Sequence, residues 1–177
     1  MKYVAVFFLL GLWFTAPFQW AGNPSSSIRL ASPQEVGEPL VVSGTLYQSD
    51  GKTPAPGVKI YIYNTDHKGY YNEDAQGVPR ISGTLTTDEK GAYRFATIRP
   101  GSYPDNRIPA HIHYVIYAPN GRQQRVDLHF AGDRKLSQAM IRKHDPADPF
   151  SSIQNLVKDK DGNWTCRLDL KLNSSDR

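Results

Sequence analysis

The feature that most constrains the fold of this chain is a succession of short apolar runs separated by glycine, proline and aspartate. The separating segments, such as "SDGKTPAPG", "DEKG" and "PNGR", are typical of turns. The runs are rich in β-branched and aromatic residues, which predicts β-strands. They occupy residues 39–48, 58–64, 81–87, 92–98, 111–118 and 124–130. We therefore expect an all-β fold, a β-sandwich of two packed, mostly antiparallel sheets with long loops.

The C-terminal third continues this pattern with one interruption. Residues 133–152 are expected to hold at most one short helix before a proline-containing loop. Residues 152–159 and 163–172 are expected to form a last strand pair. Alternate residues of the second strand, Cys166 among them, point to the same face. We therefore interpret Cys166 as a packed core residue and not as a nucleophile.

The first 22 residues differ from the rest of the chain. Lys2 is followed by an apolar run without an acidic residue, which predicts a secretory signal peptide at 1–22. An N-terminal membrane anchor is the competing interpretation, because the run approaches the length of a membrane span. Residues 23–34 are expected to be a tether and 35–177 a single domain. The domain is then secreted or periplasmic and free of the membrane, or membrane-anchored if the segment is not cleaved.

Charge and cysteine content exclude some classes of partner and crosslink. The formal net charge is +4, and no run of lysine and arginine concentrates it, so we expect no nucleic-acid partner. The single cysteine excludes an intrachain disulfide. Stability has to come from packing, or from a metal ion that joins distant parts of the chain.

The motif "PAHIH" places two histidines, His111 and His113, on one face of a predicted strand. If both imidazoles are buried, each needs a hydrogen-bond partner or a metal. Two histidines are too few to complete a metal site. Carboxylates are poor candidates for the missing ligands, because Asp50, Asp88 and Glu89 lie in turn signatures where they have a local role.

Tyrosines are the other candidate ligands. Tyr70, Tyr71 and Tyr103 lie in loops beside glycine or proline, where a large aromatic gains less from burial. A phenol titrates near pH ~10, so it binds as a phenolate only beside a strongly polarising cation. Two phenolates and two neutral imidazoles would offset two of three positive charges. This balance suits ferric iron with a hydroxide, whereas zinc or copper would not require tyrosines.

These motifs resemble the intradiol ring-cleaving dioxygenases, the family that opens catechol and protocatechuate rings. The resemblance extends over about residues 37–133. It is carried by "GVKIYIYNTDHKGYY", "TTDEKGAYRFATIRPGSYP", "IPAHIHYVIYAP" and "LHFAGD". The family's ligand set, two tyrosines and two histidines on one ferric ion, implies Tyr71, Tyr103, His111 and His113. Tyr70 is the alternative first tyrosine if the register shifts by one residue.

The resemblance implies an enzyme, a non-haem Fe(III) dioxygenase. It would insert both atoms of O2 into a catechol-type ring and cleave between the two hydroxyl-bearing carbons, giving a muconate-type product. In this family the diol displaces the phenolate of Tyr103, which carries off a substrate proton, so Tyr103 is also the expected catalytic residue. The expected partners are a catecholic small molecule and O2, and association into a homo-oligomer is compatible with the family.

Two positions depart from the family pattern. An arginine directly precedes "PAHIH" in protocatechuate-cleaving relatives, whereas here Ile108 has that place and Arg107 is one residue earlier. Asp127 replaces a family glutamine. A one-residue shift on an extended segment turns the side chain of Arg107 to the other face. Arg107, Ile108 and Asp127 are the candidate substrate-binding residues.

Two alternatives to the enzyme remain. The turn glycines and the "PG-Y" tyrosine also occur in exported non-enzymatic sandwich modules of the carboxypeptidase regulatory-like or transthyretin-like type. The other alternative is a metal-binding relative without turnover.

Overall fold

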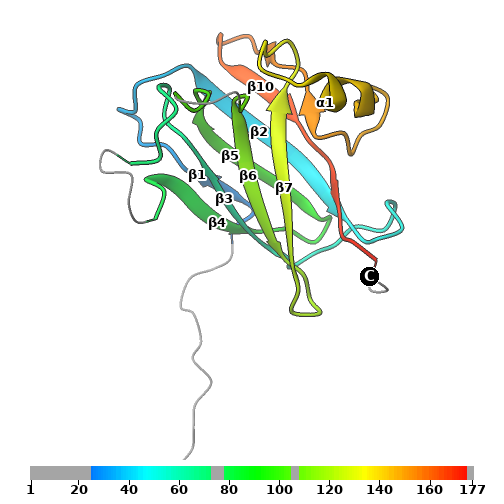
Figure 1. Cartoon of the computed structure of the whole chain (residues 1–177). Coiled ribbons are helices and arrows are strands. Elements are labelled where there is room, and N and C mark those ends of the chain that lie inside the picture. Colours follow the sequence, from blue (N-terminus) through cyan, green and yellow to red (C-terminus); the bar gives the residue numbers. More distant parts are fainter. Residues whose placement is uncertain (1–24, 73–77, 105–107, 175–177) are drawn as a thin grey trace, which may run out of the picture.

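The computed structural model describes residues 25–72, 78–104 and 108–174. Two β-sheets pack face to face, and one short helix lies at the end of the sandwich (Figure 1). The first sheet has the order β1-β5-β2-β10-β9, with β11 also paired to β2. Its strands are β1 (Ser27–Arg29), β2 (Pro39–Tyr47), β5 (Ala92–Ile98), β9 (Val157–Lys158), β10 (Trp164–Arg167) and β11 (Leu170–Lys171).

The second sheet has the order β4-β3-β6-β7-β8. Its strands are β3 (Lys59–Asn64), β4 (Ile81–Thr86), β6 (His111–Tyr117), β7 (Gln123–Phe130) and β8 (Ile153–Gln154). The predicted all-β sandwich is confirmed. Both sheets are mixed, because β1 runs parallel to β5, β8 runs parallel to β7, and β10 and β11 run parallel to β2. The long central strands pair antiparallel, as do β9 and β10.

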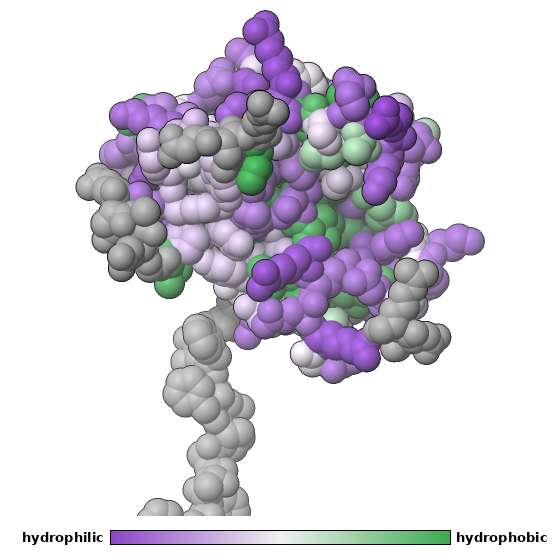
Figure 2. Space-filling model, viewed as in Figure 1, coloured by the Kyte–Doolittle hydropathy of each residue, from purple (hydrophilic) through white to green (hydrophobic). Residues whose placement is uncertain are grey.

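The core lies between the two sheets and follows the alternation of the strands. Leu40 and Val42 of β2 point inward from the first sheet, and Ile60 and Ile62 of β3 point inward from the second. Each fully buried side chain of this size stabilises the fold by about 1.5–3 kcal/mol. The other face of the second sheet is thereby left to polar and aromatic residues, and Figure 2 shows a largely hydrophilic surface on the visible side.

The helix and the buried cysteine agree with the sequence. Helix α1 (Gln138–Lys143) is capped by Ser137, whose Oγ accepts a hydrogen bond of 3.2 Å from the Met140 N–H. Cys166 is buried among core residues, with 6% of its surface exposed. In the part of the chain that the structure describes, no helix is long and apolar enough to cross a membrane.

Two expectations about chain segments are wrong. Residues 152–159 do not form one strand, because β8 joins β7 in the second sheet, and only β9 pairs with β10 as the sequence predicted. The tether interpretation fails for residues 27–31, since β1 pairs with β5, and Leu30 and Ala31 are buried in the core. The predicted signal segment 1–22 lies outside the described residues.

Candidate metal centre

The two histidines lie at the start of β6, on the outward face of the second sheet. Strand β6 is flanked by β3 and β7, and directly opposite residues of antiparallel strands share a face. His113 therefore has Tyr63 on one side and Asp127 on the other, while His111 lies opposite His129. The period of the strand thus gathers imidazole, phenol and carboxylate groups on one patch of the sheet.

Tyr71 and Tyr103 come from two loops whose backbones touch. A Cβ atom added to Gly69 would lie 2.0 Å from the Ser102 carbonyl oxygen, so only glycine permits this approach. Gly69 also has φ +93°, a conformation that L-residues rarely adopt. The two tyrosines follow Gly69 and Ser102 closely in sequence, and the contact therefore holds their rings near each other.

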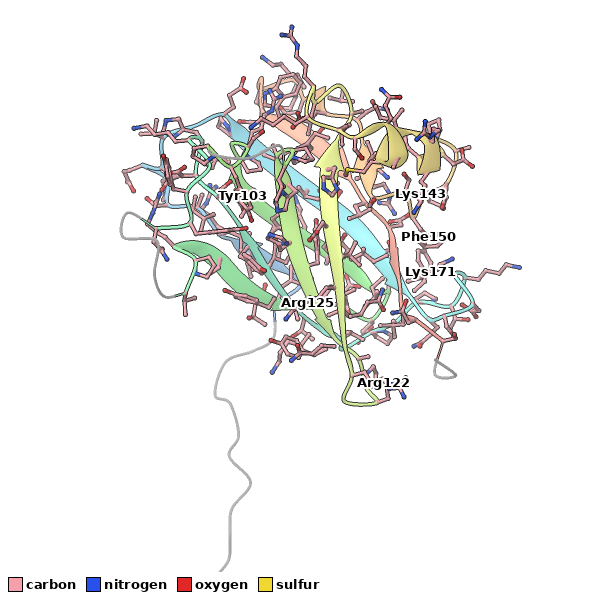
Figure 3. The ribbon with its side chains drawn as sticks, viewed as in Figure 1. Tyr103, Arg122, Arg125, Lys143, Phe150 and Lys171 are labelled. Carbon is pink, nitrogen blue, oxygen red and sulfur yellow. The ribbon has the colours of Figure 1, made fainter. Side chains whose placement is uncertain are left out.

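Hydrogen bonds fasten the same two loops. Gly101 N–H donates to the Asp66 carbonyl over 2.8 Å, and Thr65 Oγ1 donates to the Gly101 carbonyl over 2.8 Å. The Asp66 carboxylate accepts the N–H groups of Lys68 and Tyr70 and closes its own turn. The "PGSYP" and "KGYY" motifs are therefore parts of one assembly. Tyr103 lies toward the start of β6, at the opposite end of the strand from Arg122 (Figure 3).

The four predicted ligand residues converge in the structure. The Nε2 atoms of His111 and His113 are 2.8 Å apart, and Tyr71 Oη lies 2.8 Å from His113 Nε2. Tyr103 Oη lies 3.4 Å from His111 Nε2 and 3.5 Å from His113 Nε2, and is hydrogen-bonded to Tyr71 Oη. The Tyr70 side chain is outside this group and 48% exposed. The geometry therefore favours Tyr71 over Tyr70 as the first tyrosine.

The outer nitrogens of the two imidazoles fix where their lone pairs point. His111 Nδ1 lies 2.8 Å from the Pro109 carbonyl oxygen, which can only accept a hydrogen bond. His113 Nδ1 lies 2.6 Å from Asp127 Oδ1, also an acceptor when ionised. Both Nδ1 atoms therefore carry the proton in the neutral rings, and both Nε2 lone pairs face each other. Burial lowers the pKa of His111 and favours its neutral form.

This donor set fits a ferric ion. Separations of 2.8–3.5 Å are those of neighbouring ligands that each lie about 2.0–2.2 Å from a common ion. Burial and the Tyr103 hydrogen bond raise the pKa of Tyr71, so a strongly polarising cation is required to remove its proton. Among the residues described, no group of three or more His, Cys, Asp or Glu could hold a metal. Any metal site built around this histidine pair therefore depends on the tyrosines.

Aromatic rings support the centre from the neighbouring strand. The Tyr63 ring stacks on the His113 ring with centroids 4.5 Å apart, and Tyr61 stacks on Tyr63 at 5.4 Å. Because these contacts restrict the rotation of the imidazole, they help to keep His113 Nε2 directed at the tyrosine oxygens.

His129 is a neighbour that the sequence pattern did not single out. Its ring centroid lies 5.6 Å from that of His111, and its buried Nδ1 has no hydrogen-bond partner among the described residues. Burial lowers the pKa of His129. The sequence does show that Asp127 and His129, two residues apart in a strand, share a face. It does not show that this face adjoins the histidine pair, because that depends on the pairing of β7 with β6.

The three predicted substrate-binding residues differ in whether the structure describes them and in what they contact. Arg107 lies outside the described residues. Ile108 precedes β6 in a loop and is 42% exposed, while Asp127 is hydrogen-bonded to His113. Asp133 Oδ2 accepts the Ala110 N–H at 2.9 Å and so helps to fix the start of β6.

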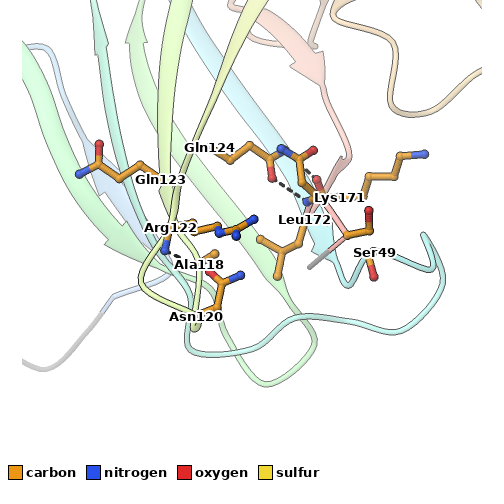
Figure 4. Close-up of a pocket in the computed structure, with 10 residues that line it drawn as sticks. Ser49, Ala118, Asn120, Arg122, Gln123, Gln124, Lys171 and Leu172 are labelled. Atoms are coloured by element: carbon orange, nitrogen blue, oxygen red, sulfur yellow. Dashed lines mark hydrogen bonds between the residues drawn. The ribbon is translucent and has the colours of Figure 1, made fainter. Parts of the chain in front are cut away.

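A separate cavity of about 620 Å³ lies at the opposite end of the sandwich (Figure 4). It is lined by amide, hydroxyl and basic side chains from the β6–β7 turn and the C-terminal segment. It contains none of the predicted site residues and no phenol, imidazole or carboxylate group. This cavity therefore has no part in the group of donor residues at the start of β6.

Comparisons with known proteins agree with this site. The dioxygenase family model matches residues 16–167. The catechol 1,2-dioxygenase of Acinetobacter baylyi is 32% identical over 141 residues, which cover 66% of this chain and 45% of that protein. The protocatechuate 3,4-dioxygenase beta chain of Burkholderia cepacia is 29% identical over 126 residues, 64% of this chain and 53% of that one. The chain spans about half the length of these curated relatives.

Solved structures show the same fold. The dioxygenase domain of a dioxygenase–carbohydrate-binding protein fusion from Streptomyces sp. SirexAA-E superposes with a TM-score of 0.65 at 24% identity. The match covers 92% of this chain and 96% of that domain. Catechol 1,2-dioxygenase from Acinetobacter sp. ADP1 has a TM-score of 0.64 at 25% identity, covering 86% of this chain and 59% of that one.

Proposed function

Because the chain belongs to the intradiol ring-cleavage dioxygenase family, we propose that it is a non-haem ferric enzyme that cleaves catechol-type rings. Its substrates are O2 and a vicinal aromatic diol, and its product is a muconate-type diacid. The observation that carries the proposal is the convergence of two phenol oxygens and two imidazole nitrogens, each of which lies within 3.5 Å of at least two of the others. These groups come from two loops and one strand, and Tyr71 precedes Tyr103 by 32 residues in the sequence.

The roles of the residues follow from their chemistry. Tyr71, Tyr103, His111 and His113 would hold the ferric ion. The ion, when bound, supplies the positive charge that lets a diol lose its protons and makes the ring reactive toward dioxygen. Tyr103 Oη accepts one hydroxyl proton of the diol and thus acts as a general base. The stacked ring of Tyr63 keeps His113 in place during this proton transfer.

The compartment is a further part of the proposal. A signal peptide at residues 1–22 would deliver the domain to a secreted or periplasmic location. An oxidising compartment suits a centre that stays ferric. Diols released outside the cell are then the natural substrate pool, and the family resemblance is compatible with a homo-oligomer.

A metal-binding relative without turnover is the second candidate. It is favoured by the exposed Ile108 and by Asp127, both of which depart from the family pattern beside the site. A non-enzymatic sandwich module is not favoured, because a purely structural role for these residues does not explain why four donor atoms converge.

Iron content, colour and oxygen uptake test the proposal together. We expect the purified protein to contain about one iron per chain and to absorb visible light through phenolate-to-iron charge transfer. Catechol or a substituted catechol should then elicit oxygen uptake. A colourless protein that takes up zinc in preference to iron would overturn the proposal. A coloured protein that is inactive on a panel of diols would support the second candidate.

Single tyrosine variants locate the ligands. Tyr71→Phe and Tyr103→Phe should each shift or weaken the visible band, because each removes one phenolate. Tyr70→Phe is the matched control: it deletes the same hydroxyl from the adjacent, exposed residue and should keep the band. Loss of the band in Tyr70→Phe, with its retention in Tyr71→Phe, would reverse the assignment.

A further inference from the structure

The carboxylate of Asp127 is in direct contact with one of the two histidines. Its Oδ1 atom lies 2.6 Å from His113 Nδ1, and the two residues face each other in the β6–β7 register. The equivalent nitrogen of His111 is bonded instead to the uncharged carbonyl of Pro109 at 2.8 Å. The two imidazoles of the centre therefore have different partners, one anionic and one neutral.

From this contact we infer that Asp127 is a positioning residue that supplies the third negative charge of the centre through His113. The inference rests on the proposed function. Two phenolates offset two of the three charges of a ferric ion, and the Asp127 carboxylate offsets the remaining one. The hydrogen bond also holds the Nδ1–H tautomer of His113, which leaves Nε2 free to bind.

The surroundings of Asp127 leave its charge available to the centre. In the described part of the chain, no lysine or arginine forms an ion pair with Asp127, and its close partner is the Nδ1–H group of His113. The His113 side chain is more enclosed than that of Asp127, with 20% exposed against 46%. Solvent therefore screens the exposed side of the Asp127 carboxylate, and its charge acts on the centre through the short hydrogen bond to the more enclosed His113.

The consequence is a centre that prefers the ferric state. A carboxylate partner makes an imidazole a more basic ligand, and a nearby negative charge stabilises Fe(III) more than Fe(II). A neutral amide at this position would accept the same hydrogen bond without this effect.

Two variants separate the charge from the hydrogen bond. Asp127→Asn keeps an acceptor oxygen and removes the charge, whereas Asp127→Leu removes both. Glu89→Gln makes the same change of charge and serves as the control, because Glu89 lies in an exposed turn after β4, at the opposite end of the sheet from His111 and His113. Outer partners of metal ligands typically contribute 10–100-fold to metal affinity. We expect Asp127→Asn to weaken Fe(III) binding by at least about tenfold in a chelator competition, with a smaller effect on Fe(II).

The reduction potential gives a readout that a purely structural role would not move. Each tenfold loss of Fe(III) preference over Fe(II) raises the midpoint potential by about 59 mV. The potential should therefore rise in Asp127→Asn and stay unchanged in Glu89→Gln. Equal potentials in the wild type and Asp127→Asn, both loaded with iron, would overturn the inference while leaving the proposed function intact.

A measurement without iron tests the tautomer. Nitrogen-15 NMR of the metal-free protein should show His113 protonated on Nδ1 in the wild type and in Asp127→Asn, and a mixture of tautomers in Asp127→Leu. An Nδ1–H tautomer that persists in Asp127→Leu would refute the positioning role. A wild type with the expected tautomer that binds no iron would overturn the proposed function, and the charge inference with it.

Discussion

Substitution of Gly69 by alanine tests whether the close contact between two loops assembles the centre. Gly69 has φ +93°, and an added Cβ would lie 2.0 Å from the Ser102 carbonyl oxygen. Real Cβ contacts essentially never fall below 3.0 Å, so the two backbones have to separate by about 1 Å. Tyr71 and Tyr103 are carried by these loops, and their oxygen atoms would separate with them.

The magnitude follows from two contributions. An L-residue in the left-handed region costs about 1–2 kcal/mol, and forced overpacking costs about 1–3 kcal/mol. Gly69→Ala should therefore lower the free energy of unfolding by about 2–5 kcal/mol. A displacement of ~1 Å in a catalytic group can reduce the rate about 100-fold, and a similar loss of oxygen uptake is expected here.

Gly57→Ala is the matched control for the strain alone. Gly57 also has a positive φ, +69°, but a Cβ there would meet no atom within 4 Å. We expect this variant to lose only about 1–2 kcal/mol and to keep its iron colour. Urea unfolding and the visible spectrum of both proteins provide the assay. If Gly69→Ala matched Gly57→Ala in stability and in colour, the loop contact would not be what positions the tyrosines.

Three further predictions concern a buried thiol, a buried carboxylate and iron binding. Burial raises the pKa of the Cys166 thiol to about 12, which disfavours the reactive thiolate. The native protein should therefore not react with a disulfide reagent at pH ~8, whereas the denatured protein should react. Rapid labelling of the native protein would contradict this prediction. Asp169 Oδ1 accepts a hydrogen bond from the Thr45 N–H and pairs with Arg167, both at 2.8 Å. Asp169→Ala should therefore lower the free energy of unfolding by about 1–3 kcal/mol, measured by urea unfolding. An unchanged unfolding midpoint would contradict this prediction. Since the pKa of Tyr71 is raised, its proton competes with the metal. Iron affinity, measured by chelator competition, should fall as the pH is lowered from about 8 to 6, and protons should be released on binding. An iron affinity that does not change with pH would refute the displacement of phenol protons.

The strands were predictable because their information is local. The six long strands end within one residue of the ranges that the alternation of apolar residues predicts. The same local pattern placed His111 and His113 on one face, and the glycine- and proline-flanked tyrosines marked the two loops. Each of these inferences uses only the period of a strand or the conformational demands of a turn.

The tertiary structure decided what the short and distant segments do. Strand β1 and the separate pairings of β8 and β9 depend on which sheet edge is free, and the sequence does not encode this locally. The contacts of Asp127 with His113 and of His129 with His111 depend in the same way on the β6–β7 register. A one-residue shift of that register would turn both side chains to the core face. The candidate donor residues could therefore be named from the sequence and the family resemblance together. Their partners arise only from the pairing of strands, because pairing is a property of two segments and not of one.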